Sequence, residues 1–563
     1  MRKDLTIGIV GAGGDGVVVL GGIILKIAAG QGYYAFREQH TEAQIRGGGS
    51  AVRLCLKTES VLMPADELDI LVCFNWEKYL VFIKELPIDE RTIVFYDGLP
   101  PAELKLPARS FEVSFSQNKN IAALGFLAKV LSLPPKEAEK IIDEDIARGK
   151  KDLLEKSLAA LKLGESLFDE TKHPKIGLPI LERQSPKIVL HGNEAAARGA
   201  IKAGCRFAAS YPITPGTEAT DYLKKELERI GGVYIQAEDE IASMGLVMGA
   251  SSVGVKAIDV TSGPGLDLKT EMIGLGVTAE IPLVLINVQR GGPSTGIPAK
   301  TEQSDLNQAI YGGHGDAPRV VLAPYNLEGC YELTIEAFNI AERFQVPVIL
   351  LSDQWLGQTL VAADDDFLKK EPVVVGRKKP NETEKNNYRR YLVTPDFVSP
   401  MANAGDEGFT YQTRGLSHNE RGEPAQDHEA SQLMHDKRWK KLLPLKERED
   451  LVKIFGNQKS KVGIIVWGST GQAILGALKA SGLEDRVKVC IPELIYPLPT
   501  TALRKFLKPL KKLLVVELNY SGQFYRYLTS QVDLPKKRLV YQRAGGRPFG
   551  FKELIQKIEE ALQ

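Results

Sequence analysis

The stretch LTIGIVGAGGDGVVVLGGIILKIAA, residues 5–29, places a strand-like segment, a glycine-rich turn and an apolar helix in succession. The apolar residues of 5–10 predict a buried strand, and the apolar run 17–29 predicts a helix that begins directly after the turn. A strand followed by a tight turn and a helix is the repeating unit of α/β proteins. We therefore predict that this stretch belongs to an α/β domain.

The glycines of this turn have the spacing of a dinucleotide-binding loop. Gly11, Gly13 and Gly16 form Gly-x-Gly-x-x-Gly after the predicted strand, and Glu38 follows near the position of a ribose-binding carboxylate. This pattern favours a nicotinamide dehydrogenase locally, and that interpretation stays open from the residues alone.

The same turn also contains the first residues of a thiamine diphosphate motif, Gly14-Asp15-Gly16. The asparagine that such a motif requires further along is absent, and Glu42-Ala43-Gln44 stands there instead. The turn is therefore not predicted to hold the diphosphate of thiamine. It can still hold a phosphate at its helix N-terminus, although Asp15 adds an unfavourable negative charge there.

Composition excludes several classes of function. The 563 residues contain 72 Lys and Arg against 71 Asp and Glu, so no overall basic charge predicts a nucleic-acid or anionic-membrane partner. No apolar run reaches the ~18–20 residues that a transmembrane helix needs, and we expect a cytoplasmic protein. The five cysteines form no Cys-x-x-Cys pair, so we expect buried thiols, no metal site and no iron–sulfur cluster in this chain. They are Cys55, Cys73, Cys205, Cys330 and Cys490.

The chain is too long for a single hydrophobic core, and strand and helix patterns repeat along it. A polar, proline-containing linker and a loop-rich polar segment divide these patterns. A second α/β unit is predicted to begin with a strand at residues 187–190. The expected segments are an N-terminal α/β domain (1–170), a linker (171–186), a central α/β domain (187–375), a loop-rich connecting segment (376–458) and a C-terminal α/β domain (459–563).

The central domain contains the residues that carry chemistry. The turn Tyr211–Pro215 has two prolines and can present hydroxyl and amide groups at the carboxyl end of a strand, where α/β sheets bind ligands. Glu238, Asp239 and Glu240 precede a helix of small and apolar residues, so they fit helix caps. Glu240 nevertheless shares an apolar helix face, where a carboxyl group suits proton transfer. Arg290 follows a buried strand beside a glycine-rich loop and suits a carboxylate or phosphate.

Several motifs in a fixed order resemble those of the α subunit of 2-oxoacid:ferredoxin oxidoreductases. The resemblance covers nearly the whole chain and is nearest to the 2-oxoglutarate type, in which a γ domain precedes the α domain. Its motifs include Gly192–Ala195, Tyr211–Pro215, Thr261–Gly265, Gln289–Gly296, Glu302–Leu306, His314–Asp316, Leu351–Gln354, Thr394–Met401, His418–Gly422, Asp436–Arg438, Asn519–Gln523 and Gly545–Phe549.

This resemblance implies a multidomain α/β fold with three domains. They are a Rossmann-like γ domain, a domain that binds the aminopyrimidine of thiamine diphosphate, and a C-terminal domain like that of transketolase. Counting from Gly249-Ala250 places the family's N1′-contacting glutamate at Glu240, with Glu238 the less favoured choice. The resemblance further implies that Tyr211, Pro212 and Ile213 contact the cofactor and that Thr214 and Arg290 bind the 2-oxoacid carboxylate.

The remaining parts of the reaction are implied to lie elsewhere. A separate β subunit would supply the Mg²⁺-bound diphosphate and a [4Fe-4S] cluster, in an (αβ)₂ heterotetramer that passes electrons to ferredoxin and an acyl group to coenzyme A. The chain alone would then be inactive. The γ-domain loop with Gly13, Gly14 and Arg46 resembles the region associated with coenzyme A.

Four positions depart from the family pattern, namely Gly216, Asp267, Lys269 and Ala299. They flank the predicted site, so pyruvate or another 2-oxoacid stays open as an alternative substrate to 2-oxoglutarate. A nicotinamide dehydrogenase and a scaffold subunit without catalytic activity are the alternatives from other classes.

Overall fold

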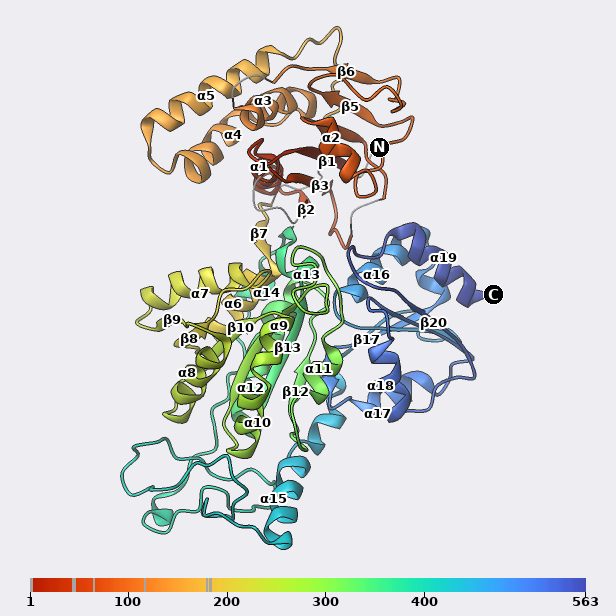
Figure 1. The fold of residues 1–563 in the computed structure, drawn as a ribbon. Helices are drawn as coiled ribbons and strands as arrows, with labels where there is room; N and C mark the ends of the chain where they lie inside the picture. Colours follow the sequence, from red (N-terminus) through yellow and green to blue (C-terminus); the bar gives the residue numbers. More distant parts are fainter. Residues whose placement is uncertain (1–3, 43–46, 64–65, 116–117, 179–180, 182–184) are drawn as a thin grey trace. The chain divides into compact units, whose positions relative to one another are not determined.

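The computed structural model describes residues 4–42, 47–63, 66–115, 118–178, 181 and 185–563. The chain forms two compact units (Figure 1). The first consists of Met1–His191, Gln358–Lys369 and Gly550–Lys552, and the second of Gly192–Gly357, Lys370–Phe549 and Glu553–Gln563.

The first unit is built on an eight-stranded sheet in the order β6-β5-β4-β1-β3-β2-β14-β7. From β6 to β1 the strands are parallel, and from β1 to β7 each neighbouring pair is antiparallel. The strands are β1 (Asp4–Ala12), β2 (Tyr34–Thr41), β3 (Gly49–Lys57), β4 (Ile70–Cys73), β5 (Ile93–Tyr96), β6 (Ser110–Glu112), β7 (Ile188–His191) and β14 (Leu360–Ala363).

Helices cover both faces of this sheet. The larger core cluster joins α1, α3, α4 and α5 to the sheet, and the smaller one joins α2 to residues of β1, β3, β4 and β5 (Figure 1). Helices α3 and α5 pack closely at Gly125 and Gly164. A Cβ on Gly125 would lie 2.0 Å from the carbonyl oxygen of Leu161, so no larger residue fits there. The helices are α1 (Val17–Gly30), α2 (Trp76–Val81), α3 (Lys119–Leu131), α4 (Pro135–Ile141), α5 (Lys151–Ser166) and α14 (Asp366–Lys369).

The strand and helix predicted for residues 5–29 form as β1 and α1. The strand predicted at 187–190 also forms, as β7, but it lies in the sheet of the first unit. There it pairs with β14, which lies near the end of the predicted central domain and also pairs with β2.

The second unit contains a seven-stranded sheet in the order β18-β12-β13-β11-β10-β8-β9, parallel except for β18. Strand β11 is buried along its entire length, as expected for a central parallel strand. Its strands are β8 (Phe207–Ser210), β9 (Val233–Gln236), β10 (Ala257–Thr261), β11 (Leu283–Gln289), β12 (Val320–Leu322), β13 (Pro347–Asp353) and β18 (Leu494–Tyr496). Its helices are α6 (Gly192–Lys202), α7 (Thr217–Arg229), α8 (Glu240–Ser252), α9 (Gly263–Leu268), α10 (Thr270–Thr278), α11 (Leu306–Tyr311), α12 (Leu327–Phe344) and α13 (Gln354–Gln358).

A five-stranded sheet, ordered β15-β17-β16-β19-β20, completes the second unit. One hydrophobic cluster includes residues of both sheets, among them Leu285 of β11 and Trp467 beside β16. The sheet and its helices are β15 (Val452–Gly456), β16 (Val462–Val466), α16 (Ser469–Ser481), β17 (Lys488–Pro492), α17 (Thr500–Leu507), β19 (Lys512–Glu517), α18 (Gln523–Gln531), β20 (Lys537–Gln542) and α19 (Phe551–Leu562).

The segment that connects the two sheets of the second unit in the chain is bonded to Glu280 by buried, positively charged side chains. Glu280 accepts hydrogen bonds from Lys437 (2.5 Å) and Lys441 (2.7 Å) of α15 (His428–Lys440) and the residue after it. The Arg390 guanidinium donates to the Glu280 carbonyl at 2.6 Å. Lys437 and Lys441 therefore hold this segment to the residues that follow α10.

No helix in the described part of the chain is long and apolar enough to cross a membrane.

Candidate active site

Glu240 is the first residue of α8 and is 8% exposed. Asp239 caps the helix, because its Oδ1 accepts the Ala242 N–H at 2.7 Å, and Glu238 is exposed. The Glu240 side chain is thus not needed as a cap. Within the described residues, no side chain donates a hydrogen bond to its carboxylate, so both oxygens remain available to a ligand.

The Glu240 carboxylate lies against the first turn of α9, which follows β10. A Cβ on Gly265 would be 3.0 Å from Cγ of Glu240 and 3.2 Å from its Oε1. The same Cβ would be 2.1 Å from Oγ1 of Thr261. Glycine at position 265 therefore makes the space that the carboxylate occupies.

Beneath Glu240 lies a fully buried ion pair that sequence reasoning did not anticipate. Lys269 Nζ is 2.8 Å from Asp259 Oδ2, and both side chains are 0% exposed. The same ammonium donates to Ser243 Oγ (2.6 Å) and to the Glu240 carbonyl oxygen (2.9 Å). Lys269 was identified only as a departure from the family pattern, and its partner on β10 could not be recognised from spacing along the chain.

The turn Tyr211–Pro215 joins β8 to α7 at the carboxyl end of the sheet. Two buried side chains hold it: Asn193 Nδ2 donates to the Pro215 carbonyl (2.7 Å), and Arg290 Nη1 donates to the Thr214 carbonyl (2.7 Å). Tyr211 is 39% exposed and Thr214 is exposed. The structure thus places Thr214 and Arg290 in direct contact, although they are 76 residues apart in the chain.

Arg290 follows β11 and is 7% exposed. Burial lowers the pKa of Arg290, and the nearby carboxyl group of Asp305 opposes that change. In the described part of the chain, Arg290 Nε, Ser262 Oγ and Asn287 Oδ1 are buried without a hydrogen-bond partner. These three atoms belong to residues that lie in or directly after β10 and β11, and because buried polar atoms are normally paired, they could hydrogen-bond a polar ligand.

The loop after β11 is attached to the five-stranded sheet by Gln303. Its side chain donates to the Trp467 carbonyl (2.9 Å) and accepts from Thr470 Oγ1 (2.7 Å) and the Leu518 N–H (3.0 Å). The neighbouring Glu302 accepts the N–H groups of Gly292 and Gly545. The sequence analysis identified the motif Glu302–Leu306. That its side chains connect the seven-stranded and five-stranded sheets depends on contacts across the fold.

Comparison with known proteins identifies the family. Residues 198–435 match the family described as the thiamine diphosphate-binding domain of pyruvate flavodoxin/ferredoxin oxidoreductase, and residues 6–167 match pyruvate ferredoxin/flavodoxin oxidoreductase. The chain is 32% identical over 469 residues to the α subunit of 2-oxoacid:ferredoxin oxidoreductase 2 of Aeropyrum pernix, covering 80% of this chain and 72% of the relative. The chain belongs to the 2-oxoacid:ferredoxin oxidoreductase family.

Two further similarities support this assignment. The 2-oxoglutarate synthase subunit KorA of Methanocaldococcus jannaschii is 36% identical over 375 residues, which cover 66% of this chain and 98% of the relative. A solved structure of 2-oxoglutarate:ferredoxin oxidoreductase from Magnetococcus marinus, with 2-oxoglutarate, coenzyme A and succinyl-CoA bound, is 32% identical. It covers 100% of both chains with a TM-score of 0.90. The protein is therefore an α subunit of a multi-subunit oxidoreductase, and its multidomain α/β fold is confirmed.

The glycine-rich turn of this α subunit is held by a hydrogen bond within the turn and by close packing against Gly48. Asp15 Oδ2 accepts the Ala12 N–H at 2.7 Å, and a Cβ on Gly13 would be 2.9 Å from the Gly48 carbonyl oxygen. Gly14 has a φ of +101°, which favours glycine. Arg46, expected beside this loop, lies outside the described residues. Since the turn lies within the part that matches the family, it does not indicate a separate nicotinamide enzyme.

The departures Gly216 and Lys269 have structural explanations. A Cβ on Gly216 would be 3.1 Å from Val260 Cγ1, so the side chain of β10 fills the space that a larger residue needs. Lys269 is neutralised by Asp259. Nothing in the structure explains Ala299.

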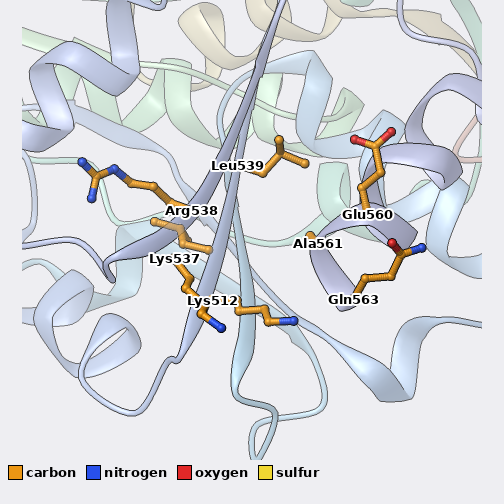
Figure 2. Close-up of a pocket in the computed structure, with 8 residues that line it drawn as sticks. Lys512, Lys537, Arg538, Leu539, Glu560, Ala561 and Gln563 are labelled. Atoms are coloured by element: carbon orange, nitrogen blue, oxygen red, sulfur yellow. The ribbon is translucent and has the colours of Figure 1, made fainter.

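A cavity of about 260 Å³ lies between β19, β20 and α19, separate from Glu240 (Figure 2). Lys537 and Arg538 at its edge are exposed. Their charges are therefore solvated. It is lined by Lys512, Leu513, Lys537, Arg538, Leu539, Glu560, Ala561 and Gln563.

Proposed function

We propose that this α subunit provides the aminopyrimidine half of a thiamine diphosphate site in an enzyme that oxidatively decarboxylates 2-oxoglutarate and forms acyl-CoA. The observation that carries the proposal is the buried Glu240 carboxylate, which has no donor from the described side chains and lies within the matched thiamine diphosphate-binding domain. The full-length similarity to a structure with 2-oxoglutarate, coenzyme A and succinyl-CoA bound supports this choice of substrates.

The residues present fit the cofactor. Gly265 provides the space that the Glu240 carboxylate occupies, and Ser262, which directly follows β10, has a buried hydroxyl without a hydrogen-bond partner. Thiamine diphosphate, when bound, supplies a nucleophilic carbon and accepts the electrons released as a carboxyl group leaves. Glu240 would hold a proton at N1′ of the aminopyrimidine, a function that a shielded carboxyl group performs well. Tyr211, Pro212 and Ile213 would line the cofactor.

Arg290 and Thr214 would bind the carboxylate of the 2-oxoacid. Arg290 already donates one N–H to the Thr214 carbonyl and retains an unpartnered, buried Nε. A guanidinium is suited to a carboxylate because its N–H groups form two parallel hydrogen bonds. It would orient the carboxylate that later leaves as CO₂.

The proposal includes a second subunit. Ile241, which follows Glu240 in α8, is 53% exposed, and Leu268 at the end of α9 is 52% exposed, so each presents an apolar side chain that a partner would cover. We propose a β subunit that brings Mg²⁺, the diphosphate site and a [4Fe-4S] cluster, in an (αβ)₂ heterotetramer that reduces ferredoxin. All five cysteines of this chain are buried, which is consistent with a cluster in the partner. Gly13 and Gly14 of the first unit, with Arg46, are proposed to contribute to coenzyme A binding.

The test uses the complex of this chain with its partner subunit and measures reduction of a viologen dye by a 2-oxoacid. Glu240→Gln should lower kcat by about 100-fold or more, since positioned proton transfer contributes that much. Glu238→Gln is the matched control, because Glu238 is an exposed acid two residues away, and it should retain activity. Full activity in Glu240→Gln would show that the catalytic assignment is wrong.

The same assay tests the substrates. We expect 2-oxoglutarate to be turned over faster than pyruvate, and activity to require thiamine diphosphate and coenzyme A. Arg290→Met should raise the KM for the 2-oxoacid about ten-fold or more, because it removes a charged hydrogen bond to the carboxylate. Faster turnover of pyruvate would overturn the proposed substrate, and activity without coenzyme A would overturn acyl transfer.

A further inference from the structure

The buried pair Asp259–Lys269 connects the three elements that surround the Glu240 carboxylate. Asp259 lies on β10, Lys269 follows α9, and the Glu240 carbonyl and Ser243 hydroxyl belong to the first turn of α8. Lys269 Nζ lies within 2.6–2.9 Å of an acceptor on each of Glu240, Ser243 and Asp259. An ammonium group has three N–H donors, so this arrangement uses all of them.

The hydroxyl of Ser243 completes the network. It accepts from Lys269 and lies 2.7 Å from Asp259 Oδ2 and 2.9 Å from the Glu240 carbonyl oxygen, so its single proton is donated to one of these two. Burial raises the pKa of Asp259, and the nearby Lys269 ammonium is the strongest of the groups that oppose this change. Both charged groups are thus shielded from water, and each is stabilised by the opposite charge of the other.

Stability alone does not explain such a pair. Replacement of a buried ion pair by well-packed apolar residues is often neutral or stabilising, because both charges must be desolvated. An apolar pair would, however, lose the hydrogen bond from Lys269 to the Glu240 carbonyl. That hydrogen bond is the direct contact between the ion pair and the backbone of Glu240.

We propose that Lys269 is a positioning residue for the reaction: it fixes the first turn of α8 and thereby the direction of the Glu240 carboxylate. The inference rests on the proposed role of Glu240. Gly265 lies between Asp259 and Lys269 in the chain and in contact with Glu240, so the same pair also holds the turn against which the carboxylate lies. A small displacement of a reacting group is sufficient to reduce turnover strongly.

The experiment compares Lys269→Met with the double variant Asp259→Asn/Lys269→Met in the complex with the partner subunit. Lys269→Met leaves Asp259 buried without its counter-charge, so both thermal stability and activity should fall. The double variant should recover stability because neither charge remains. Its kcat should stay roughly 10- to 100-fold below that of the wild type, with the KM for the 2-oxoacid unchanged.

Hydrogen exchange in the full chain gives a readout that is independent of activity. The peptide that contains Glu240–Ser243 should exchange faster in the double variant than in the wild type. Lys256→Met is the matched control, because Lys256 Nζ also donates to two main-chain carbonyls, those of Ala203 and Val375, away from Glu240. It should change neither kcat nor exchange in the first turn of α8.

The outcomes separate this inference from the proposed function. Wild-type kcat and exchange in the stable double variant would overturn the positioning role, even if Glu240→Gln is inactive. Full activity of Glu240→Gln would instead overturn the role of Glu240 and the inference with it. A double variant that does not regain stability would also contradict the argument, because the two charges would then not balance each other.

Discussion

Gly265 and Glu240 lie so close that a Cβ at position 265 would be 3.2 Å from Oε1 of Glu240. This contact joins the first turn of α9 to the first residue of α8, and it defines the space available to the carboxylate. A residue with any side chain at 265 must move either Glu240 or Thr261.

We therefore predict that Gly265→Ala lowers kcat by about 100-fold, because it displaces the Glu240 carboxylate. The overpacking should cost about 1–3 kcal/mol of stability. Steady-state kinetics and thermal unfolding measure the two effects. Gly274→Ala is the control, since a Cβ at this position of α10 meets nothing within 4 Å. Equal kinetics in the two variants would contradict the prediction.

Asp305 gives the α subunit a pH-dependent contribution to stability. Burial raises the pKa of Asp305 to about 6, a change that the hydrogen bond from Asn287 opposes. Because this pKa is above its unfolded value of 3.8, the folded chain binds more protons between about pH 4 and 6. The contribution of Asp305 to stability is therefore present below pH 4 and is lost as the pH rises through 6.

Asp305→Asn removes this dependence. The thermal midpoint of the wild type should decrease relative to that of Asp305→Asn as the pH is raised from 4 to 7, and the difference should be constant above pH 7. Other carboxyl groups titrate in both proteins and cancel in the comparison. A difference that does not change with pH would show that Asp305 has an ordinary pKa.

Glu280 is predicted to stabilise the connecting segment. Burial by itself would raise the pKa of Glu280, but Lys437 and Lys441 hold it well below its usual range, so the carboxylate is charged. Glu280→Gln leaves two buried ammonium groups without a counter-charge and should cost about 3–5 kcal/mol. Urea unfolding followed by tryptophan fluorescence measures the loss. Glu271, an exposed acid in the helix that precedes Glu280, provides the control: Glu271→Gln should have little effect, and equal losses would rule out the buried pairing.

The sequence by itself determined the order of α/β elements and the family. Alternation of apolar strands, glycine turns and helices is a local property, so β1, α1 and the central parallel strands could be predicted from residue patterns. Motifs such as Thr261–Gly265 and Glu302–Leu306 were visible for the same reason. They indicated where the site lies but not which atoms meet.

Only the tertiary structure decided the contacts across the fold. The pairing of β7 with β14, the bond from Arg290 to the Thr214 carbonyl and the hydrogen bonds made by Gln303 join residues far apart in the chain. Lys269 shows the difference most clearly: in the sequence it is a charge in an unexpected place, and in the fold it is a buried ammonium with three acceptors. The physical reason is that a buried charge is tolerated only where side chains or carbonyl groups of other elements pair with it. The spacing of residues along the chain does not show which of them come together.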